Sequence, residues 1–231
     1  MRSTRATLAD CQKRVIACRL CPRLVKWREK VAVEKRRAFA HEEYWGKPLP
    51  GWGDPKARLL VVGLAPAAHG GNRTGRMFTG DESGNWLYRA LCGAGFASQP
   101  EAIRRDDGLR LIGAYITAIV RCAPPGNKPT TAERDNCLPY LIEELRRLSR
   151  VRVIVALGHY AHDNLARALR QADLATEKTP TFSHGAESRM GPYTILDSYH
   201  PSQQNTNTHL LTRDMLGAVF QRARGLVDQE S

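Results

Sequence analysis

The chain has 231 residues, of which 42% are hydrophobic and 25% are charged, a composition that excludes a disordered chain. The length fits one well-packed core, so we expect residues 1–231 to form a single domain. The 35 Lys and Arg against 23 Asp and Glu give a formal charge of +12, which favours a polyanionic partner such as nucleic acid or a membrane surface.

The N-terminal part of the chain, residues 8–33, is expected to be helical and basic. Cys18 and Cys21 lie within it, and Pro22 is expected to end one helix or to open the next. The basic residues at the start lead into no apolar signal-peptide core, and the longest apolar run, residues 59–68, is about half of what a membrane-spanning helix needs. We therefore expect a cytoplasmic protein that does not enter a membrane.

Four β-branched apolar runs predict buried strands, and helical patterns alternate with them. The strands are expected at 58–63, 113–120, 151–157 and 193–197, and the helices at 83–92, 130–149, 158–170 and 212–224. Pro139 is expected to kink or split the second of these helices. The alternation predicts an α/β fold, a three-layer α/β/α sandwich around a mainly parallel four-stranded sheet.

Loops of unusual composition follow three of these strands. They span residues 63–81, 122–127 and 200–205. In parallel sheets, ligands bind where loops leave the carboxyl ends of the strands. We therefore expect the three loops to converge on one site.

Four of the six cysteines are candidate metal ligands: Cys18, Cys21, Cys122 and Cys137. In a reducing compartment they are not expected to form disulfides, and a four-thiol site holds either structural zinc or an iron-sulfur cluster. The first two form a single C-x2-C pair with two scattered partners, which favours iron-sulfur. Unligated core thiols are the remaining alternative. Cys11 and Cys92 fit core positions better than ligand positions.

Two motifs resemble the active-site motifs of the uracil-DNA glycosylase superfamily. The first runs from Gly63 to Asp81 and begins Gly-Leu-Ala-Pro-Ala-Ala-His-Gly; the second is His-Pro-Ser-Gln-Gln-Asn, from His200 to Asn205. The first is similar in particular to the fifth family, the iron-sulfur enzymes of bacteria and archaea, whose cluster ligands the four cysteines match in order and approximate spacing. The resemblance is weakest over residues 171–190. It implies a monofunctional glycosylase that removes uracil from DNA, is associated with the nucleoid and carries a structural 4Fe-4S cluster.

The first motif is expected to form the base pocket. An enzyme that acts on a base must flip it out of the duplex into a fitted pocket, and small residues let backbone N–H groups approach a planar ligand. A phosphate-binding glycine loop is the alternative, but neither G-x-G-x-x-G nor G-x4-G-K-[ST] occurs here. Phe78 is expected to stack on the base. The expected substrate-binding residues are Gly63, Ala65, Ala68, His69, Gly70, Phe78 and Asn205.

The second motif implies the leaving-group donor. By resemblance, His200 stabilises the departing uracil anion electrostatically. Other families carry an acidic residue at the start of the first motif, where this chain has only Leu64 and alanines. Asp81 and Asn127 are therefore the candidates to orient water, although Asn127, after Pro-Pro-Gly, also fits a purely structural turn.

Base selectivity and DNA contact complete the prediction. Related families place a uracil-reading Asn near Ala118, and its loss predicts a permissive pocket that accepts uracil and other deaminated bases such as hypoxanthine. Residues 200–205 are expected to insert into DNA, and Arg73, Arg76 and the basic region 2–37 are expected to contact its phosphates. We expect a monomer. The alternatives are a non-catalytic iron-sulfur or zinc nucleic-acid-binding protein and an electron-transfer protein.

Overall fold

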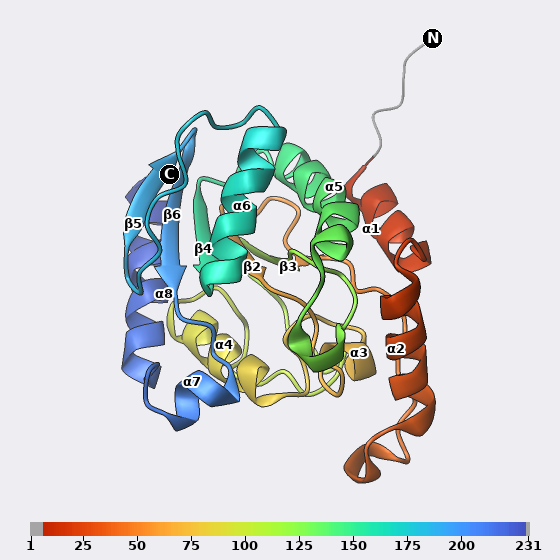
Figure 1. Ribbon diagram of the computed structural model, residues 1–231. Helices are drawn as coiled ribbons and strands as arrows, with labels where there is room; N and C mark the ends of the chain where they lie inside the picture. The colour runs from red at the N-terminus through yellow and green to blue at the C-terminus, as the bar shows by residue number, and fades with distance from the viewer. Residues whose placement is uncertain (1–6, 230–231) are drawn as a thin grey trace.

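The computed structural model describes residues 7–229, and within them six strands form one mixed sheet (Figure 1). The strands are β1 (Trp52–Gly53), β2 (Leu59–Gly63), β3 (Ala114–Ala118), β4 (Val153–Leu157), β5 (Glu187–Met190) and β6 (Tyr193–Ser198). Their order across the sheet is β1-β3-β2-β4-β6-β5. The four central strands run parallel, and β1 and β5 pair antiparallel at the two edges.

The four predicted strands therefore form the centre of a larger sheet, and the prediction of a four-stranded sheet is wrong at both edges. β1 is two residues long and lies in a segment rich in Gly and Pro. β5 has the sequence Glu-Ser-Arg-Met, with most of its side chains exposed or half-buried. A strand at a solvated edge lacks the continuous apolar run that marks a buried parallel strand, so the sequence gives no signal for it.

The helices follow the predicted order. They are α1 (Leu8–Ala17), α2 (Pro22–Glu34), α3 (Gly71–Thr74), α4 (Glu82–Gly93), α5 (Thr131–Arg147), α6 (His159–Gln171), α7 (Gln203–Asn207) and α8 (Arg213–Gln229), with two 3-10 turns, η1 (Arg37–Phe39) and η2 (Pro125–Asn127). The predicted helix at 8–33 divides around the C-x2-C pair, and Pro22 opens α2, as expected. Pro139 lies inside α5, which continues through it as one helix, so the helix is not split there.

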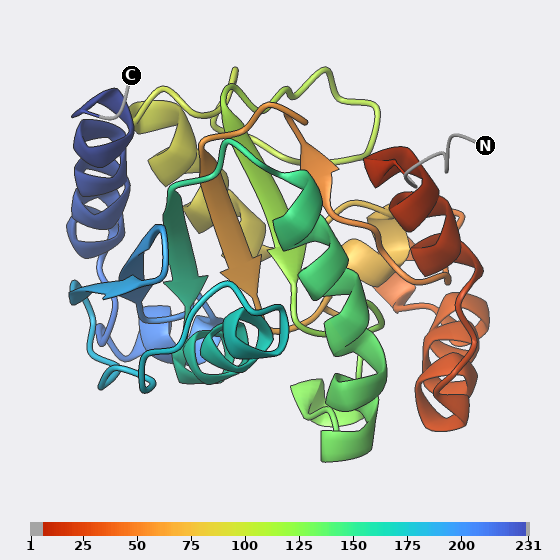
Figure 2. The ribbon, with the colours of Figure 1, turned by 90° about the horizontal axis from the view of Figure 1, so that it is seen from above.

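Alternating side chains of the buried strands supply two separate cores. Leu59 and Val61 of β2 belong to one apolar cluster, which α4 and α8 cover, whereas Leu60 and Val62 belong to the other, which α5 and α6 cover. Figure 2 shows these helix pairs on opposite faces of the sheet; α1 packs beside α5, and α2 contacts α3 (Figure 1). The predicted three-layer arrangement is confirmed. No helix within residues 7–229 is long and apolar enough to cross a membrane.

The register of the parallel strands aligns their carboxyl ends. Gly63 at the end of β2 lies opposite Ala118 at the end of β3, and Leu157 at the end of β4 lies opposite Ser198 at the end of β6. The loops that carry both motifs therefore leave the sheet at the same edge. This alignment brings the first and second motifs together.

Candidate active site

Phe78 covers the end of β2. A Cβ atom on Gly63 would lie 2.7 Å from Cζ of Phe78, so only glycine leaves room for the ring. Phe78 itself has a positive φ of 53° and is 9% exposed. The backbone N–H groups of Ile119 and Val120 donate to the carbonyls of Gly63 and Leu64, each at 2.9 Å, and fix the start of the first motif on β3. The end of β2 and Phe78 thus form one rigid surface.

His200 lies against this surface. The centroids of the His200 and Phe78 rings are 5.9 Å apart, and the ring planes are tilted by 32°. On the other side, Gly158 has a φ of +90°, and a Cβ there would come within 3.2 Å of the His200 Cβ. Burial lowers the pKa of His200 to about 4. The imidazole is therefore neutral at pH 7 and offers one N–H donor and one acceptor.

The rest of the second motif holds the His200 backbone. The Asn205 side-chain amide donates to the His200 carbonyl at 2.9 Å. The Ser202 hydroxyl accepts from the Asn205 N–H at 3.4 Å and caps α7. Gln203 and Gln204 are exposed and remain accessible to a duplex. The structure therefore places Asn205 as a support for His200, and its predicted contact with substrate stays a prediction.

Asp81 ends the first motif and caps α4. Its Oδ1 accepts from the Gly84 N–H at 2.9 Å. Its Oδ2 faces Gly70, where an added Cβ would lie only 1.8 Å from that oxygen. Burial raises the pKa of the Asp81 carboxyl, and the bond from Gly84 only partly offsets this. The carboxylate is thus a stronger base than a solvated aspartate, and it lies against the glycine loop.

The middle of the first motif is fixed by an aromatic partner. The Tyr44 hydroxyl and His69 Nδ1 are 3.1 Å apart, and the two rings meet edge to face at 6.0 Å. Burial and two nearby arginines lower the pKa of His69. Ala65 and Ala68 are half-buried, as small pocket-lining residues would be. Tyr44 thus fixes His69 in the loop, and the predicted approach of this loop to a base stays a prediction.

Asn127 lies in the 3-10 turn η2, which follows β3. It is exposed, has a positive φ of 57°, and follows Gly126, which also has a positive φ. Its N–H donates to the Pro124 carbonyl at 3.1 Å, closing the 3-10 turn after β3. β2 and β4 separate β3 from β6, the strand that leads to His200. The structure thus shows the turn role of Asn127, and its role toward water stays a prediction.

The four candidate cysteines lie in one neighbourhood. They come from the turn between α1 and α2, the loop after β3, and α5: Cys18, Cys21, Cys122 and Cys137. Burial raises the pKa of Cys122 to about 11 and that of Cys137 to about 12. Neighbouring thiols raise both pKa values further: Cys18 and Cys21 act on Cys122, and Cys21 and Cys122 act on Cys137.

A buried cation faces these thiols. Arg28 is 2% exposed, and its Nη1 donates to the Cys122 Sγ at 3.0 Å. The Asn136 amide donates to the Cys21 Sγ at 3.5 Å. Among residues 7–229, no group of three or more His, Cys, Asp or Glu side chains is placed so that it could hold a metal ion. The buried Arg28 beside Cys122 would offset the charge of a thiolate centre, and such a centre at these four cysteines stays a prediction. Cys11 is fully buried, as expected of a core residue.

Two arginines of the first motif have structural partners. Arg73 forms an ion pair with Glu42 and stacks on the Phe39 ring, and it is 7% exposed. Arg76 is 5% exposed and forms a two-bond ion pair with Asp107, at 2.7 and 2.9 Å. The prediction that these two side chains contact DNA phosphates is wrong, because their guanidinium groups are buried against carboxylates of the same chain.

The basic region 2–37 lies only partly within the described residues, which begin at Thr7. In the described part, Arg14, Arg19 and Arg23 each form an ion pair with a glutamate. Its contact with DNA stays a prediction.

Several residues that shape the site carry no local signal in the sequence. Gly158 leaves room for the His200 side chain, the Tyr44 hydroxyl lies 3.1 Å from His69 Nδ1, and the Arg28 guanidinium donates to Cys122. A lone glycine between a strand and a helix marks a junction, but nothing local says which side chain it will face.

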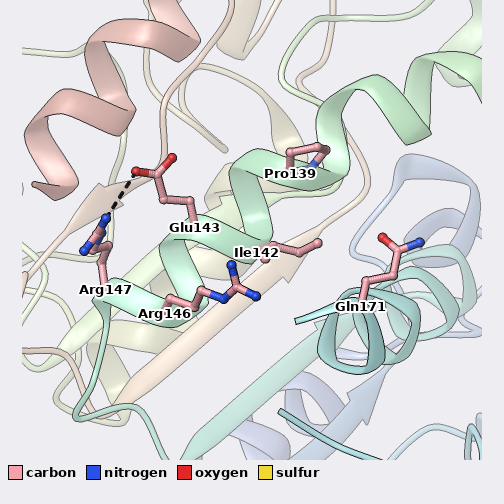
Figure 3. A pocket seen from close by; sticks show the side chains of 6 residues that line it. All are labelled: Pro139, Ile142, Glu143, Arg146, Arg147 and Gln171. Carbon is pink, nitrogen blue, oxygen red and sulfur yellow. Dashed lines mark ion pairs between the residues drawn. The ribbon is translucent and has the colours of Figure 1, made fainter. Parts of the chain in front are cut away.

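A hollow in the described part of the chain lies elsewhere. Figure 3 shows it between α5 and α6, with a volume of about 640 Å³, and it is lined by Pro139, Ile142, Glu143, Arg146, Arg147 and Gln171. An ion pair between Glu143 and Arg147 spans one turn of α5 at 3.9 Å. None of the predicted site residues lines this hollow, so the candidate active site rests on the motifs and their contacts.

The sequence matches a known family over most of its length. The family model described as the uracil DNA glycosylase superfamily matches residues 50–224. The chain belongs to the uracil DNA glycosylase superfamily. The match begins just before β1 and ends within α8, so it spans the whole sheet and both motifs.

Similar proteins refine this membership within the superfamily. A type-5 uracil-DNA glycosylase of Mycobacterium bovis is 53% identical over 94% of this chain and 80% of that protein. One of Thermus thermophilus is 53% identical over 91% of this chain and 94% of its own length. One of Pyrobaculum aerophilum is 46% identical over 93% of this chain and 91% of its own length. The resemblance to the fifth family is confirmed.

Proposed function

We propose that this superfamily member is a uracil-DNA glycosylase that hydrolyses the N-glycosidic bond of uracil in DNA. The proposal is supported by the type-5 relatives, which bear that name over nearly the whole chain. The observation that carries it is the neutral His200 packed on Phe78, directly beside the end of β2. This arrangement joins a hydrogen-bond donor to an aromatic face where a flipped base would lie.

The proposed reaction begins with uracil flipped out of the duplex and stacked at Phe78. The bond between C1′ of the sugar and N1 of uracil breaks, and the bonding electrons leave with the base. The N–H of neutral His200 donates to a uracil carbonyl oxygen and stabilises this anion without transferring its proton. Water adds its oxygen to C1′ and loses one proton, and the free base gains one. The products are uracil and an abasic site.

Asp81 is the proposed base that orients this water. Its carboxylate faces Gly70 of the pocket loop, and its raised pKa makes it a better proton acceptor than a solvated aspartate. Asn127, an amide that can bind water but not take its proton, is the second candidate. We favour Asp81 because Asn127 is exposed in its turn.

The test is single-turnover excision on a duplex with one uracil. His200→Ala and Asp81→Ala are each expected to lower the excision rate by about 100-fold or more, the scale seen when one oxyanion donor is lost. Binding to the same duplex should change little, because neither side chain is proposed to contact phosphates. If either variant cleaves at the wild-type rate, its catalytic role is refuted. An abasic product that stays uncut until alkali is added supports a monofunctional enzyme.

We also propose that the pocket accepts other deaminated bases such as hypoxanthine. Ala118, 1% exposed and opposite Gly63, offers only a methyl group where a selective amide would discriminate between bases. Duplexes with a single uracil, hypoxanthine or normal base test this. Release of uracil alone at high enzyme concentration overturns the claim of breadth.

The four cysteines are proposed to hold a structural 4Fe-4S cluster. The cluster would tie α2, the loop after β3 and α5 together, and Arg28 would offset its negative charge. The four cysteines could hold either an iron-sulfur cluster or zinc. Iron, sulfide and zinc are therefore measured together in protein purified without oxygen. Four iron atoms and four sulfides per chain support the cluster, whereas one zinc per chain refutes it.

The proposed partner is DNA that contains uracil or other deaminated bases, bound by a monomer near the nucleoid. The net charge of +12 favours phosphate contacts, so affinity should fall steeply with salt. A non-catalytic nucleic-acid-binding protein would share this behaviour. Base release separates the two, since iron-containing protein that binds DNA and releases no base refutes the enzyme.

A further inference from the structure

A buried histidine and aspartate lie next to the active site and have no part in the proposed reaction. His162 belongs to α6 and Asp197 to β6, and each side chain is 1% exposed. The distance from His162 Nδ1 to Asp197 Oδ1 is 2.7 Å. Buried charges are kept in proteins only when they are paired, so this pair constrains both elements.

Both ring nitrogens of His162 face oxygen atoms. Its second ring nitrogen, Nε2, lies 2.9 Å from the Pro180 carbonyl oxygen, which can only accept. The Asp197 carboxylate also accepts, so both ring nitrogens donate. Burial by itself lowers the pKa of His162, but these two acceptors outweigh it and raise the pKa above its usual value. The imidazole is thus held between the Asp197 carboxylate and the Pro180 carbonyl.

The pair spans the two junctions that meet at His200. Gly158, at the end of β4, lies four residues before His162, and Asp197 lies three residues before His200. The Gly158 N–H donates to the Ser198 carbonyl at 2.7 Å, directly between these junctions. A Cβ added at Gly158 would lie 3.2 Å from the His200 Cβ, so the two residues are close neighbours. A shift of either junction therefore moves His200.

An aromatic segment joins the same histidine to the neighbour of His200. The Phe182 ring meets His162 edge to face at 5.6 Å and lies 6.1 Å from the Tyr199 ring. His184 stacks on Tyr199 at 5.2 Å, and its Nδ1 accepts from the Tyr199 N–H at 3.2 Å. Phe182 and His184 therefore hold Tyr199, the residue before His200. His162 contacts Phe182 as well as Asp197.

We propose that His162 is a positioning residue, which through Asp197 and the segment around Phe182 fixes the backbone that aims the His200 N–H at the departing base. The proposal rests on the proposed role of His200. His162 touches no substrate in this account. It acts because a donor that stabilises developing charge must stay within a narrow range of distance and direction.

The test compares His162→Gln in two backgrounds. The glutamine amide can bond one of the two oxygens but not both, so the strand junction loosens. In the wild-type background, we expect the single-turnover rate at saturating enzyme to fall by about 10- to 100-fold, the cost of a misplaced catalytic group. The dissociation constant for uracil DNA should change by less than about threefold, because no phosphate contact is lost. In the His200→Ala background, His162→Gln should add no further loss of rate.

Two more variants complete the experiment. His41→Gln makes the same exchange at an exposed position and should keep the wild-type rate. Asp197→Asn keeps the size of the side chain and removes the charge; it carries the same expectation as His162→Gln and decides the question if that variant does not fold. In the His162→Gln protein, the imidazole NMR signals of His200 should also shift.

The outcomes separate the two proposals. If His162→Gln slows excision equally with and without His200, or weakens DNA binding instead of slowing excision, the positioning role is refuted and the proposed function stands. If His200→Ala itself excises uracil at the wild-type rate, the proposed role of His200 fails. A wild-type rate in both His162→Gln and Asp197→Asn also refutes the positioning role.

Discussion

The protonation state of His200 offers a direct test of the site. Burial lowers its pKa from the usual 6.5 to about 4, so the folded protein keeps the imidazole neutral where the unfolded chain takes up a proton. Between these values the unfolded state binds more protons, and the folded state therefore loses stability as the pH falls. Each pH unit below 6.5 costs about 1.4 kcal/mol, so His200 should cost about 2 kcal/mol at pH 5.

His200→Gln removes this titration and nothing else that titrates. The free energies of unfolding of wild type and variant are measured in urea at pH 7, 6 and 5. The value for wild type minus the value for the variant should fall by about 2 kcal/mol from pH 7 to pH 5. His69 and His184, whose pKa values are also lowered, titrate in both proteins and cancel. As a second readout, the His200 ring proton should keep its neutral-form NMR shift down to pH 5. Parallel stability curves, or a His200 midpoint near 6.5, would show that the imidazole is solvated and refute the reasoning.

Three further changes test the contacts around the first motif. Gly70→Ala places a Cβ within 1.8 Å of the Asp81 Oδ2, so both the excision rate and the melting temperature should fall; unchanged values would mean that loop and carboxylate do not touch. Asp81→Asn can still cap α4, whereas Asp81→Ala loses about 1 kcal/mol of stability, measured by urea unfolding. Both Asp81 variants should lose excision activity. If Asp81→Asn still excises uracil, the reaction does not need a carboxylate at this position. Arg76→Ala leaves Asp107 buried without its partner and should lower the free energy of unfolding by about 3–5 kcal/mol without changing the salt dependence of DNA binding. If DNA binding by Arg76→Ala depends less steeply on salt than that of wild type, Arg76 does contact a phosphate.

The central sheet is predictable because its signal is local. β2, β3, β4 and β6 are buried along their whole length, so each is rich in apolar residues, and β2 and β4 are apolar throughout. The edge strands β1 and β5 form only because a neighbouring strand offers them hydrogen bonds. Their own residues carry no pattern that predicts a strand.

In the candidate site, too, only the features that lie within one sequence motif were predictable. Gly63 and Phe78 lie in one motif, and the chemistry of a base pocket accounts for both before their contact is seen. Asp81 is different, because its capping of α4 and its position against Gly70 appear only when the loop is folded. The arginines of the motif differ most, since their charge suggested DNA and their burial gave them carboxylate partners.

The sequence by itself determined the four parallel strands, their order along the chain and the edge of the sheet where both motifs lie, because apolar runs and glycine loops are local features. Only the tertiary structure decided which polar side chains face the site and which face each other. Arg76 pairs with Asp107, 31 residues away, and His162 with Asp197, 35 residues away. The charge of a side chain is known from the sequence, but its ion-pair partner depends on which segments the packed sheet brings together.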